Sequence, residues 1–141
     1  MGTTSTLLCI HRDLTQLSVL KEKGYELATA TNGSDGLRLL MSRSVDAVVL
    51  EHHLSHVDGT AIADEIKQER PEIPIVMLVD HLEIPSTALQ SVDALVSKSD
   101  GDHFLWATVH FVLNVKPTQR REARLRAQRL EAQRRDDLPR R

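Results

Sequence analysis

Short apolar segments alternate along the chain with longer segments in which apolar residues recur at helical spacing. The short segments are rich in β-branched residues and cover residues 6–11, 25–30, 46–51, 74–79 and 93–97. The third and fourth are apolar without alternation, which indicates strands buried on both faces of a parallel sheet. The pattern therefore predicts an α/β domain in which five strands are joined by right-handed helical crossovers.

The segments between these strands carry helix boundaries. Gly24 ends a first helix, and Asp58 opens a third that stops before Pro71. A short fourth helix is predicted over residues 83–91 and a fifth over residues 101–116. The apolar surface expected for the fifth helix consists of Phe104, Leu105, Thr108, Val109, Phe111 and Val112.

In open parallel sheets, ligands bind beyond the carboxyl ends of the strands. The polar residues at those predicted ends are His11-Arg12-Asp13, Glu51-His52, Asp80 after Val79, and Lys98-Ser99. We therefore expect any functional site to be built from these four groups.

The net charge of −2 hides a division of the chain. Residues 1–117 carry nine Lys/Arg against sixteen Asp/Glu, a balance of −7, whereas residues 118–141 carry nine Arg against four acids, a balance of +5. We expect a domain over 1–117 and an Arg-rich tail over 118–141, which is helical or disordered. Three interpretations of the tail remain open: a solvated end, a helix that docks on an acidic partner, and a nucleic-acid-binding segment.

Several function classes are disfavoured. No run of about 18 apolar residues is present, so a membrane-spanning helix is not expected. The N-terminus lacks a signal pattern, which makes the cytoplasm the expected compartment. Cys9 lies in an apolar segment as a packed thiol, and no nucleophile–base pair or Gly-rich phosphate loop is found, so we do not expect an enzyme.

Six segments occur in an order typical of one family. They are Gly24-Tyr25-Glu26, Ala30-Thr31-Asn32-Gly33, residues 45–50, Asp58-Gly59, residues 73–78, and Lys98. In this order and at nearly the family's spacing, residues 6–116 resemble the receiver domain of two-component response regulators. The resemblance implies a flavodoxin-like, three-layer (βα)5 fold whose parallel strands follow the order 2-1-3-4-5.

The resemblance also implies a phosphorylation pocket, from which this chain departs. A receiver holds Mg²⁺ on adjacent acids after the first strand and phosphorylates an aspartate after the third. A Ser or Thr after the fourth strand and a lysine after the fifth hold the phosphoryl oxygens. Here the corresponding residues are His11, Arg12 and Asp13 in the acidic-pair region, Glu51 at the phosphoacceptor position, Val79 at the Ser/Thr position, Leu95 at the aromatic switch position, and the retained Lys98.

These substitutions predict a pocket with altered chemistry. A guanidinium cannot ligate Mg²⁺ and repels it, so Mg²⁺ binding is expected to be lost or weak, with Asp13 as a residual oxygen ligand. We expect a salt-bridged cluster in which Glu51 lies between Lys98 and Arg12. Two interpretations stay open: Glu51 mimics a phosphoaspartate, or the pair is merely degenerate, which Val79 favours because no hydroxyl remains to move inward.

The resulting hypothesis is a stand-alone pseudo-receiver that acts as a phosphorylation-independent protein-interaction module. Its expected surface is the predicted fourth helix, fifth strand and fifth helix, and its expected partner is a histidine kinase or a downstream signalling protein, with a homodimer left open. The alternatives are a phosphorelay receiver regulated by an unusual route and a nucleic-acid-binding regulator that acts through the tail, the less favoured partner class. A metal site is disfavoured because its candidate ligands match no known spacing. Those candidates are His11, His52, His53, His56 and His81.

Overall fold

The computed structural model describes residues 4–54, 58–80 and 89–115. Its parallel strands form one sheet in the order β2-β1-β3-β4-β5, as the sequence predicts. The strands are β1 (Thr6–Ile10), β2 (Glu26–Ala30), β3 (Ala47–Glu51), β4 (Ile75–Val79) and β5 (Ala94–Ser97). The helices are η1 (Leu14–Leu17), α1 (Ser18–Glu22), α2 (Gly33–Ser42), α3 (Gly59–Glu69), η3 (Lys98–Asp100) and α4 (Asp102–Asn114).

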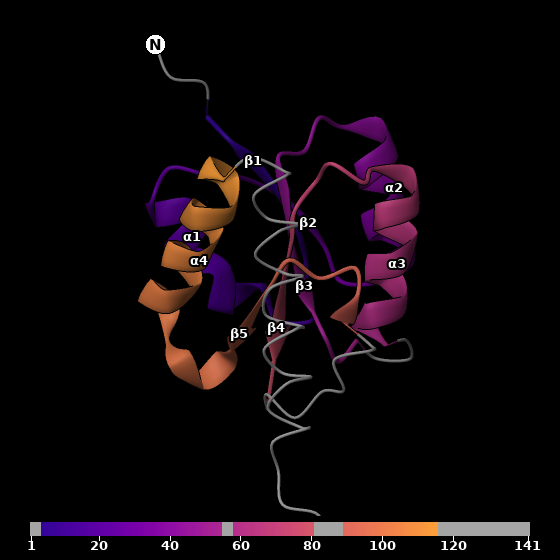
Figure 1. Cartoon of the computed structure of the whole chain (residues 1–141). Coiled ribbons are helices and arrows are strands. Elements are labelled where there is room, and N and C mark those ends of the chain that lie inside the picture. Colours follow the sequence, from indigo (N-terminus) through magenta and orange to yellow (C-terminus); the bar gives the residue numbers. More distant parts are fainter. Residues whose placement is uncertain (1–3, 55–57, 81–88, 116–141) are drawn as a thin grey trace, which may run out of the picture.

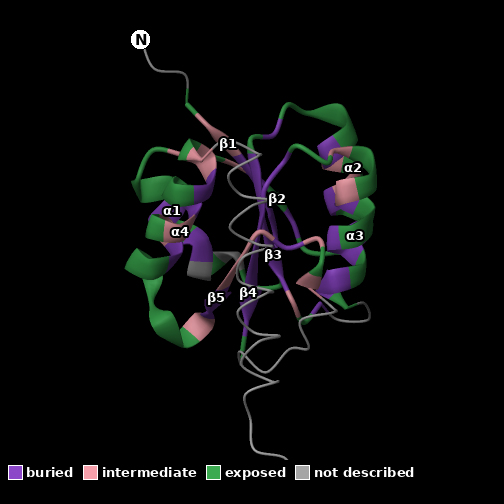
Figure 2. Cartoon of the chain, in the orientation of Figure 1, coloured by how far each residue is buried: buried purple, intermediate pink, exposed green. Residues whose placement is uncertain are grey.

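The sheet lies between two helical layers (Figure 1). Helices α2 and α3 cover one face, where Leu8, Leu50 and Met77 belong to the core, and α1 and α4 cover the other, where Cys9 and Val49 do. Every residue of β3 and β4 is buried, and Figure 2 shows these strands as the buried centre of the molecule. The prediction from their unbroken apolarity is therefore confirmed.

Two predicted helices differ in the structure. The first helix begins as the 3₁₀ turn η1, which the Asp13 side chain caps, so that only the five residues of α1 are α-helical. The apolar set predicted for the fifth helix, here labelled α4, is split between two sides. Leu105, Val109 and Val112 are buried, whereas Phe104 and Phe111 are exposed. None of the described helices is long and apolar enough to cross a membrane.

Some predictions fall where the structure gives no description. Most of the predicted fourth helix (83–91) and the whole tail (118–141) lie outside the described residues. The division of the chain near residue 117 therefore stays a prediction.

The turn from β3 into α3 fixes the position of the strand end. The Gly59 N–H donates to the His52 carbonyl oxygen at 2.8 Å. A Cβ atom on Gly59 would lie 2.5 Å from the Glu51 carbonyl oxygen and 2.9 Å from the His52 Cα, so only glycine fits without a backbone shift. This close approach holds the end of β3 against the start of α3.

Candidate functional site

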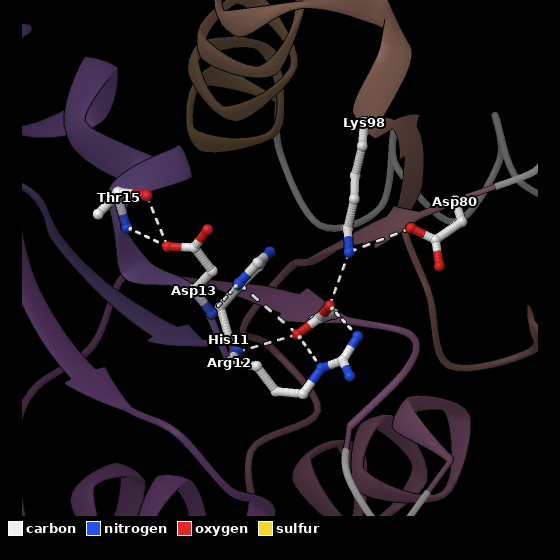
Figure 3. Close-up of polar contacts among 7 residues, drawn as sticks. His11, Arg12, Asp13, Thr15, Asp80 and Lys98 are labelled. Atoms are coloured by element: carbon white, nitrogen blue, oxygen red, sulfur yellow. Dashed lines mark hydrogen bonds and ion pairs between the residues drawn. The ribbon is translucent and has the colours of Figure 1, made fainter.

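Glu51 is the last residue of β3, and its side chain is only 1% exposed. Oε2 accepts hydrogen bonds from the Arg12 backbone N–H at 2.9 Å and from Arg12 Nε at 3.3 Å. Oε1 accepts from a terminal guanidinium nitrogen of Arg12 at 3.1 Å and from Lys98 Nζ at 2.6 Å. Both carboxylate oxygens are thus engaged by cations from two other strand ends (Figure 3).

The two cations differ in their surroundings. The Arg12 side chain is 47% exposed and places its guanidinium fork across the carboxylate, the strong geometry for this pair. Lys98 is more enclosed and also pairs with Asp80 Oδ1 at 3.2 Å. Arg12, Glu51, Lys98 and Asp80 therefore form a chain of alternating charges, and we call these four residues the ion cluster. Its formal charges sum to zero, which makes the burial of Glu51 tolerable.

The ion cluster decides the ionisation of Glu51. Burial alone would raise the pKa of Glu51, but hydrogen bonds from the Arg12 side chain, Lys98 and the Arg12 backbone outweigh it and lower the pKa from 4.5 to about 2. Burial likewise opposes the charge of Lys98, yet its bonds to Glu51 and Asp80 raise its pKa above the ordinary value. Both groups are accordingly charged at neutral pH.

His11 lies beside the ion cluster but is held in its neutral form. Its ring is buried, and Nδ1 accepts a hydrogen bond from the Asp13 backbone N–H at 2.8 Å, so the ring proton is on Nε2. Nδ1 is 3.6 Å from Glu51 Oε2, and Nε2 finds no hydrogen-bond partner among the described residues. Burial lowers the pKa of His11, and this outweighs the attraction of Glu51.

Asp13, a candidate oxygen ligand from the sequence, is engaged elsewhere. Its Oδ1 accepts from the Thr15 N–H at 3.1 Å and from the Thr15 hydroxyl at 2.5 Å. These bonds cap η1 and lower the pKa of Asp13. Neither contact involves Glu51, and the bonds to Thr15 occupy Oδ1 of Asp13.

Val79 and Leu95 contribute to the core on the side of α2 and α3. Val79 is buried in the same cluster as Ile10 and Met77, and Leu95 packs against that cluster from β5. Neither side chain carries a polar atom. The positions that the family resemblance assigns to a hydroxyl and an aromatic ring are therefore occupied by aliphatic packing.

The sequence analysis did not identify the capping box that encloses Lys98. The Ser97 N–H donates to Asp100 Oδ2 at 3.1 Å, while the Ser97 hydroxyl accepts from the Ser99 N–H at 3.4 Å, which closes a capping box around η3. The sequence does contain a pattern that could have predicted this capping box, since Asp100 follows Ser97 by three residues. Asp80 was named at a strand end but not as the second partner of Lys98, although both residues follow neighbouring strands.

Among the described residues, His52 and His53 lie beside each other, next to Asp58. His52 Nε2 is 3.3 Å from Asp58 Oδ1, and the His52 and His53 rings pack edge to face at 4.7 Å. His56 and His81 lie outside the described residues. Within the described part of the chain, no three His, Cys, Asp or Glu residues are arranged to hold a metal ion.

The donor set at the end of β3 does not fit Mg²⁺. This ion requires oxygen ligands in near-octahedral geometry, and the one buried carboxylate already uses both oxygens for cations. Arg12 also places a permanent positive charge where a divalent cation would have to approach. The site can neutralise a carboxylate, but it offers no vacant acidic pair.

Comparisons with known proteins agree with the fold. Residues 11–98 match the model of the response regulator receiver domain family. The chain is 31% identical over 78 residues to the transcriptional regulatory protein GlrR of Escherichia coli K12, covering 55% of this chain and 18% of GlrR. It is 31% identical over 111 residues to the transcriptional regulatory protein AfsQ1 of Streptomyces coelicolor, covering 77% of this chain and 42% of AfsQ1. The chain thus spans less than half the length of either relative.

Solved structures with the same architecture include a CheY-like receiver domain from Methanospirillum hungatei, with a TM-score of 0.74 and 19% identity over 85% of this chain and 99% of that one. The response regulator TrrA of Thermotoga maritima, solved in complex with Mg²⁺ and BeF, has a TM-score of 0.69 and 26% identity over 78% of this chain and 99% of that one. Because the family match covers more than half of the chain and the strand order is that of the fold, this chain belongs to the response regulator receiver domain family.

Proposed function

We propose that this chain is a pseudo-receiver, a signalling module that acts through protein contacts without being phosphorylated on an aspartate. One observation carries the proposal: the carboxylate of Glu51 is engaged through both oxygens by Arg12 and Lys98. A carboxylate held in this way is poorly placed to attack phosphorus, because attack requires a free oxygen in line with the leaving group.

The charge balance supports the same conclusion. Phosphoryl transfer depends on cations that neutralise the developing charge on the phosphoryl oxygens. Here the positive charges of Arg12 and Lys98 are already committed to Glu51 and Asp80. An incoming phosphoryl group would therefore meet a neutral, occupied ion cluster.

Packing argues against a switch between two states. Val79 is buried in the core and has no hydroxyl that a phosphoryl group could draw inward. A signal can shift a population only where two states differ in their affinity for it. The short 2.6 Å contact between Lys98 and Glu51 leaves a second interpretation open, in which Glu51 permanently mimics a phosphorylated aspartate.

The proposed docking surface lies on α4 beside the edge strand β5. Phe104 and Phe111 of α4 are 50% and 57% exposed and lie two turns apart on one side of the helix, so together they offer apolar area to a partner. A histidine kinase or a downstream signalling protein is the expected partner class. That the protein works as a stand-alone module remains a prediction.

Intact-mass measurement after incubation with phosphoramidate and Mg²⁺ tests the proposal. We expect no change in mass for the parent chain. An acid-labile addition of one phosphate on Glu51 or Asp13 would contradict the proposal and favour a phosphorelay receiver.

A restored variant provides the matched control. It carries His11→Asp, Arg12→Asp, Glu51→Asp and Val79→Thr and therefore returns the acidic pair, the acceptor and the hydroxyl that the family resemblance implies. We expect this restored variant to gain the mass of one phosphate under the same conditions, which would show that the phosphodonor is competent.

The balance of +5 in residues 118–141 keeps nucleic-acid binding as a second candidate. Retention on DNA and RNA should be compared between the full chain and a form that ends at residue 117, each at two salt concentrations. Equal retention by both forms would exclude the tail as a nucleic-acid-binding segment. Salt-sensitive retention that disappears with the tail would favour it.

A further inference from the structure

A cavity of about 180 Å³ lies between the sheet and the first turn of α4. Its floor consists of three aliphatic side chains from three elements: Leu78 of β4, Val96 of β5 and Leu105 of α4. All three are at most 3% exposed and belong to the core on the side of α1 and α4. The floor of the cavity is therefore part of the folded core.

The rim of the cavity is polar. Ser97, Lys98, Gly101 and Asp102 complete the described lining. Gly101 has a φ of 91°, a value that favours glycine, and a Cβ atom built on it would meet no atom within 4 Å. Because Gly101 is itself exposed, the rim is open to solvent at this residue.

The charges of the rim do not favour a charged ligand. Lys98 commits its ammonium group to the ion cluster, at 2.6 Å from Glu51 Oε1 and 3.2 Å from Asp80 Oδ1, and Figure 3 shows it directed toward Asp80. An anionic ligand would meet the exposed carboxylate of Asp102, while the one cation in the described lining is already paired. A cationic ligand would lie beside Lys98 and be repelled by it. An uncharged ligand avoids both costs.

The size of the cavity limits the ligand to a single ring. Cavities that bind drug-sized ligands measure about 300–1,000 Å³, so this one is too small to enclose a nucleotide or a peptide. An aliphatic cavity of roughly 150 Å³ stays free of water and takes up one benzene molecule. Water is a poor occupant of the floor here for the same reason, because Leu78, Val96 and Leu105 offer it no hydrogen bond.

We propose that this cavity is a binding site for a small uncharged molecule with one aromatic or aliphatic ring. The ring packs on Leu78, Val96 and Leu105 and lies against Lys98. Because Lys98 belongs both to the cavity and to the ion cluster, an occupied cavity restricts the lysine to its contact with Glu51. Occupancy then stabilises the ion cluster in place of a phosphoryl group, and only this regulatory consequence rests on the function proposed above.

An NMR titration of the full chain, with its Leu and Val methyl groups labelled with ¹³C, tests the site. Benzyl alcohol is the probe, and benzoate and benzylamine are charged controls of nearly the same size. We expect benzyl alcohol to shift the methyl resonances of Leu78, Val96 and Leu105 with one saturable dissociation constant on the order of 1 mM, as is usual for a ligand of so few atoms. The methyl groups of Leu8 and Leu50, in the core on the opposite face of the sheet, should not shift.

Three outcomes would overturn the assignment. The first is the absence of saturable shifts at the three floor residues. The second is shifts of equal size on the opposite face of the sheet, because they indicate non-specific partitioning into the core. The third is binding of benzoate or benzylamine as tight as that of benzyl alcohol, which would contradict an uncharged ligand.

Two matched substitutions test whether the free space determines binding. Val96→Leu adds a methylene group to a residue that lines the cavity, whereas Val109→Leu adds one to a buried α4 residue outside the described lining. We expect Val96→Leu to weaken benzyl alcohol binding at least about fivefold and Val109→Leu to change it less than about twofold. Val96→Leu should also lower the Tm less, since overpacking is costly where no space is free. Equal effects of the two substitutions on binding would contradict the proposal.

The link between the cavity and the ion cluster has a separate test. Coupling between two sites is reciprocal, so the loss of the anion that holds Lys98 must change binding in the cavity. We expect benzyl alcohol to bind about fivefold more weakly to Glu51→Gln and equally well to Glu26→Gln, which loses only an exposed ion pair. An unchanged dissociation constant in Glu51→Gln would overturn the regulatory consequence. The phosphodonor experiment reports on phosphorylation and the titration reports on the cavity, so the two results can fail separately.

Discussion

Arg12 contacts Glu51 in two chemically different ways. Its backbone N–H donates to Oε2, a contact that depends on the path of the chain, whereas its guanidinium contact depends on the side chain. Lys98 is more enclosed than Arg12 and makes the shortest of these contacts. Because solvent screens exposed charges, we expect Lys98 to contribute more to the stability of the ion cluster than the Arg12 side chain does.

Replacing Glu51 by glutamine should destabilise the fold. The Glu51→Gln substitution leaves two neighbouring cations without their shared anion, and a broken buried pair of this kind costs about 2–4 kcal/mol after allowance for solvent around the cations. Urea unfolding measures the change. Glu26→Gln is the control, because it removes a solvent-exposed ion pair with Arg43 and should cost less than about 1 kcal/mol. Similar losses for both variants would contradict the assigned role of Glu51.

Stability should fall with acid in two pH ranges. The folded pKa of Glu51, about 2, lies below its ordinary value of 4.5, so its contribution is complete above pH 4.5 and is lost as the pH falls toward 2. The pKa of His11 is also lowered, from 6.5. Below pH 6.5 His11 is therefore protonated more readily in the unfolded chain than in the folded chain, which lowers the free energy of unfolding. Each such proton contributes up to about 1.4 kcal/mol per pH unit.

Two variants separate these ranges. His11→Asn keeps an acceptor for the Asp13 N–H but does not titrate, so the free energy of unfolding should no longer decline just below pH 6.5. Glu51→Gln should make the decline between pH 4.5 and 2 shallower, while Asp13, Asp58 and Asp80, whose pKa values are also lowered, keep part of it. An unchanged profile in His11→Asn would show that the histidine is not the group that titrates there.

At the level of elements, the turn between β3 and α3 shows how a backbone contact positions a side chain. Gly59 packs so closely on Glu51 and His52 that no Cβ fits, and its N–H closes the turn. Gly36 in α2 is also crowded, but its neighbour is the Ile10 side chain, which can move. The two glycines therefore differ in how readily the structure can adapt to a methyl group.

The substitution Gly59→Ala should cost about 2–3 kcal/mol, because backbone atoms must shift to relieve the overlap. Gly36→Ala, placed in a helix interior against a flexible side chain, should cost clearly less. Thermal unfolding of both variants provides the comparison. A larger loss in Gly36→Ala would contradict the assignment of the β3–α3 turn as the rigid contact.

The elements differ in how well the sequence predicts them. Strands β3 and β4 were predictable because a short, continuous apolar run rich in β-branched residues is typical of a strand buried on both faces. The first helix was predicted but its 3₁₀ start was not, since a side-chain cap by Asp13 and a 3₁₀ turn leave almost no trace in apolar periodicity. The division of the α4 apolar residues into a buried and an exposed side depends on the neighbouring layer, which the spacing alone does not specify.

The predictability of the site follows the same reasoning. The contact between Glu51 and Lys98 could be predicted, because the carboxyl ends of parallel strands meet at one edge of the sheet. The sequence could not decide that Asp13 would turn toward Thr15, or that the His11 ring would accept from the chain, because both depend on local backbone geometry. The role of the site as a degenerate phosphorylation pocket stays a prediction.

At the level of the whole molecule, the ion cluster joins the ends of β1, β3, β4 and β5 through charged side chains. All four charged groups are side chains of the protein, so none of them can dissociate as a bound metal ion can. The charge balance of the ion cluster therefore depends on how the fold places these four side chains.

Mg²⁺ should therefore leave the stability of the parent chain unchanged. Ligands stabilise a protein in proportion to their binding to the folded state, and we expect the Tm in millimolar MgCl₂, with or without beryllofluoride, to shift by less than about 1 °C. Differential scanning fluorimetry measures this shift, and the restored variant serves as the responsive control. A Tm that rises with MgCl₂ concentration in the parent would contradict the poor fit of the site to Mg²⁺.

The backbone N–H of Arg12 offers a way to measure how often the ion cluster opens. This amide is bonded to a buried carboxylate oxygen instead of to a backbone carbonyl. Its hydrogen can exchange with solvent deuterium only when Glu51 withdraws, whereas amides of the β1 ladder exchange when strands separate. The exchange rate of this single amide therefore reports the opening of the ion cluster separately from the opening of the sheet.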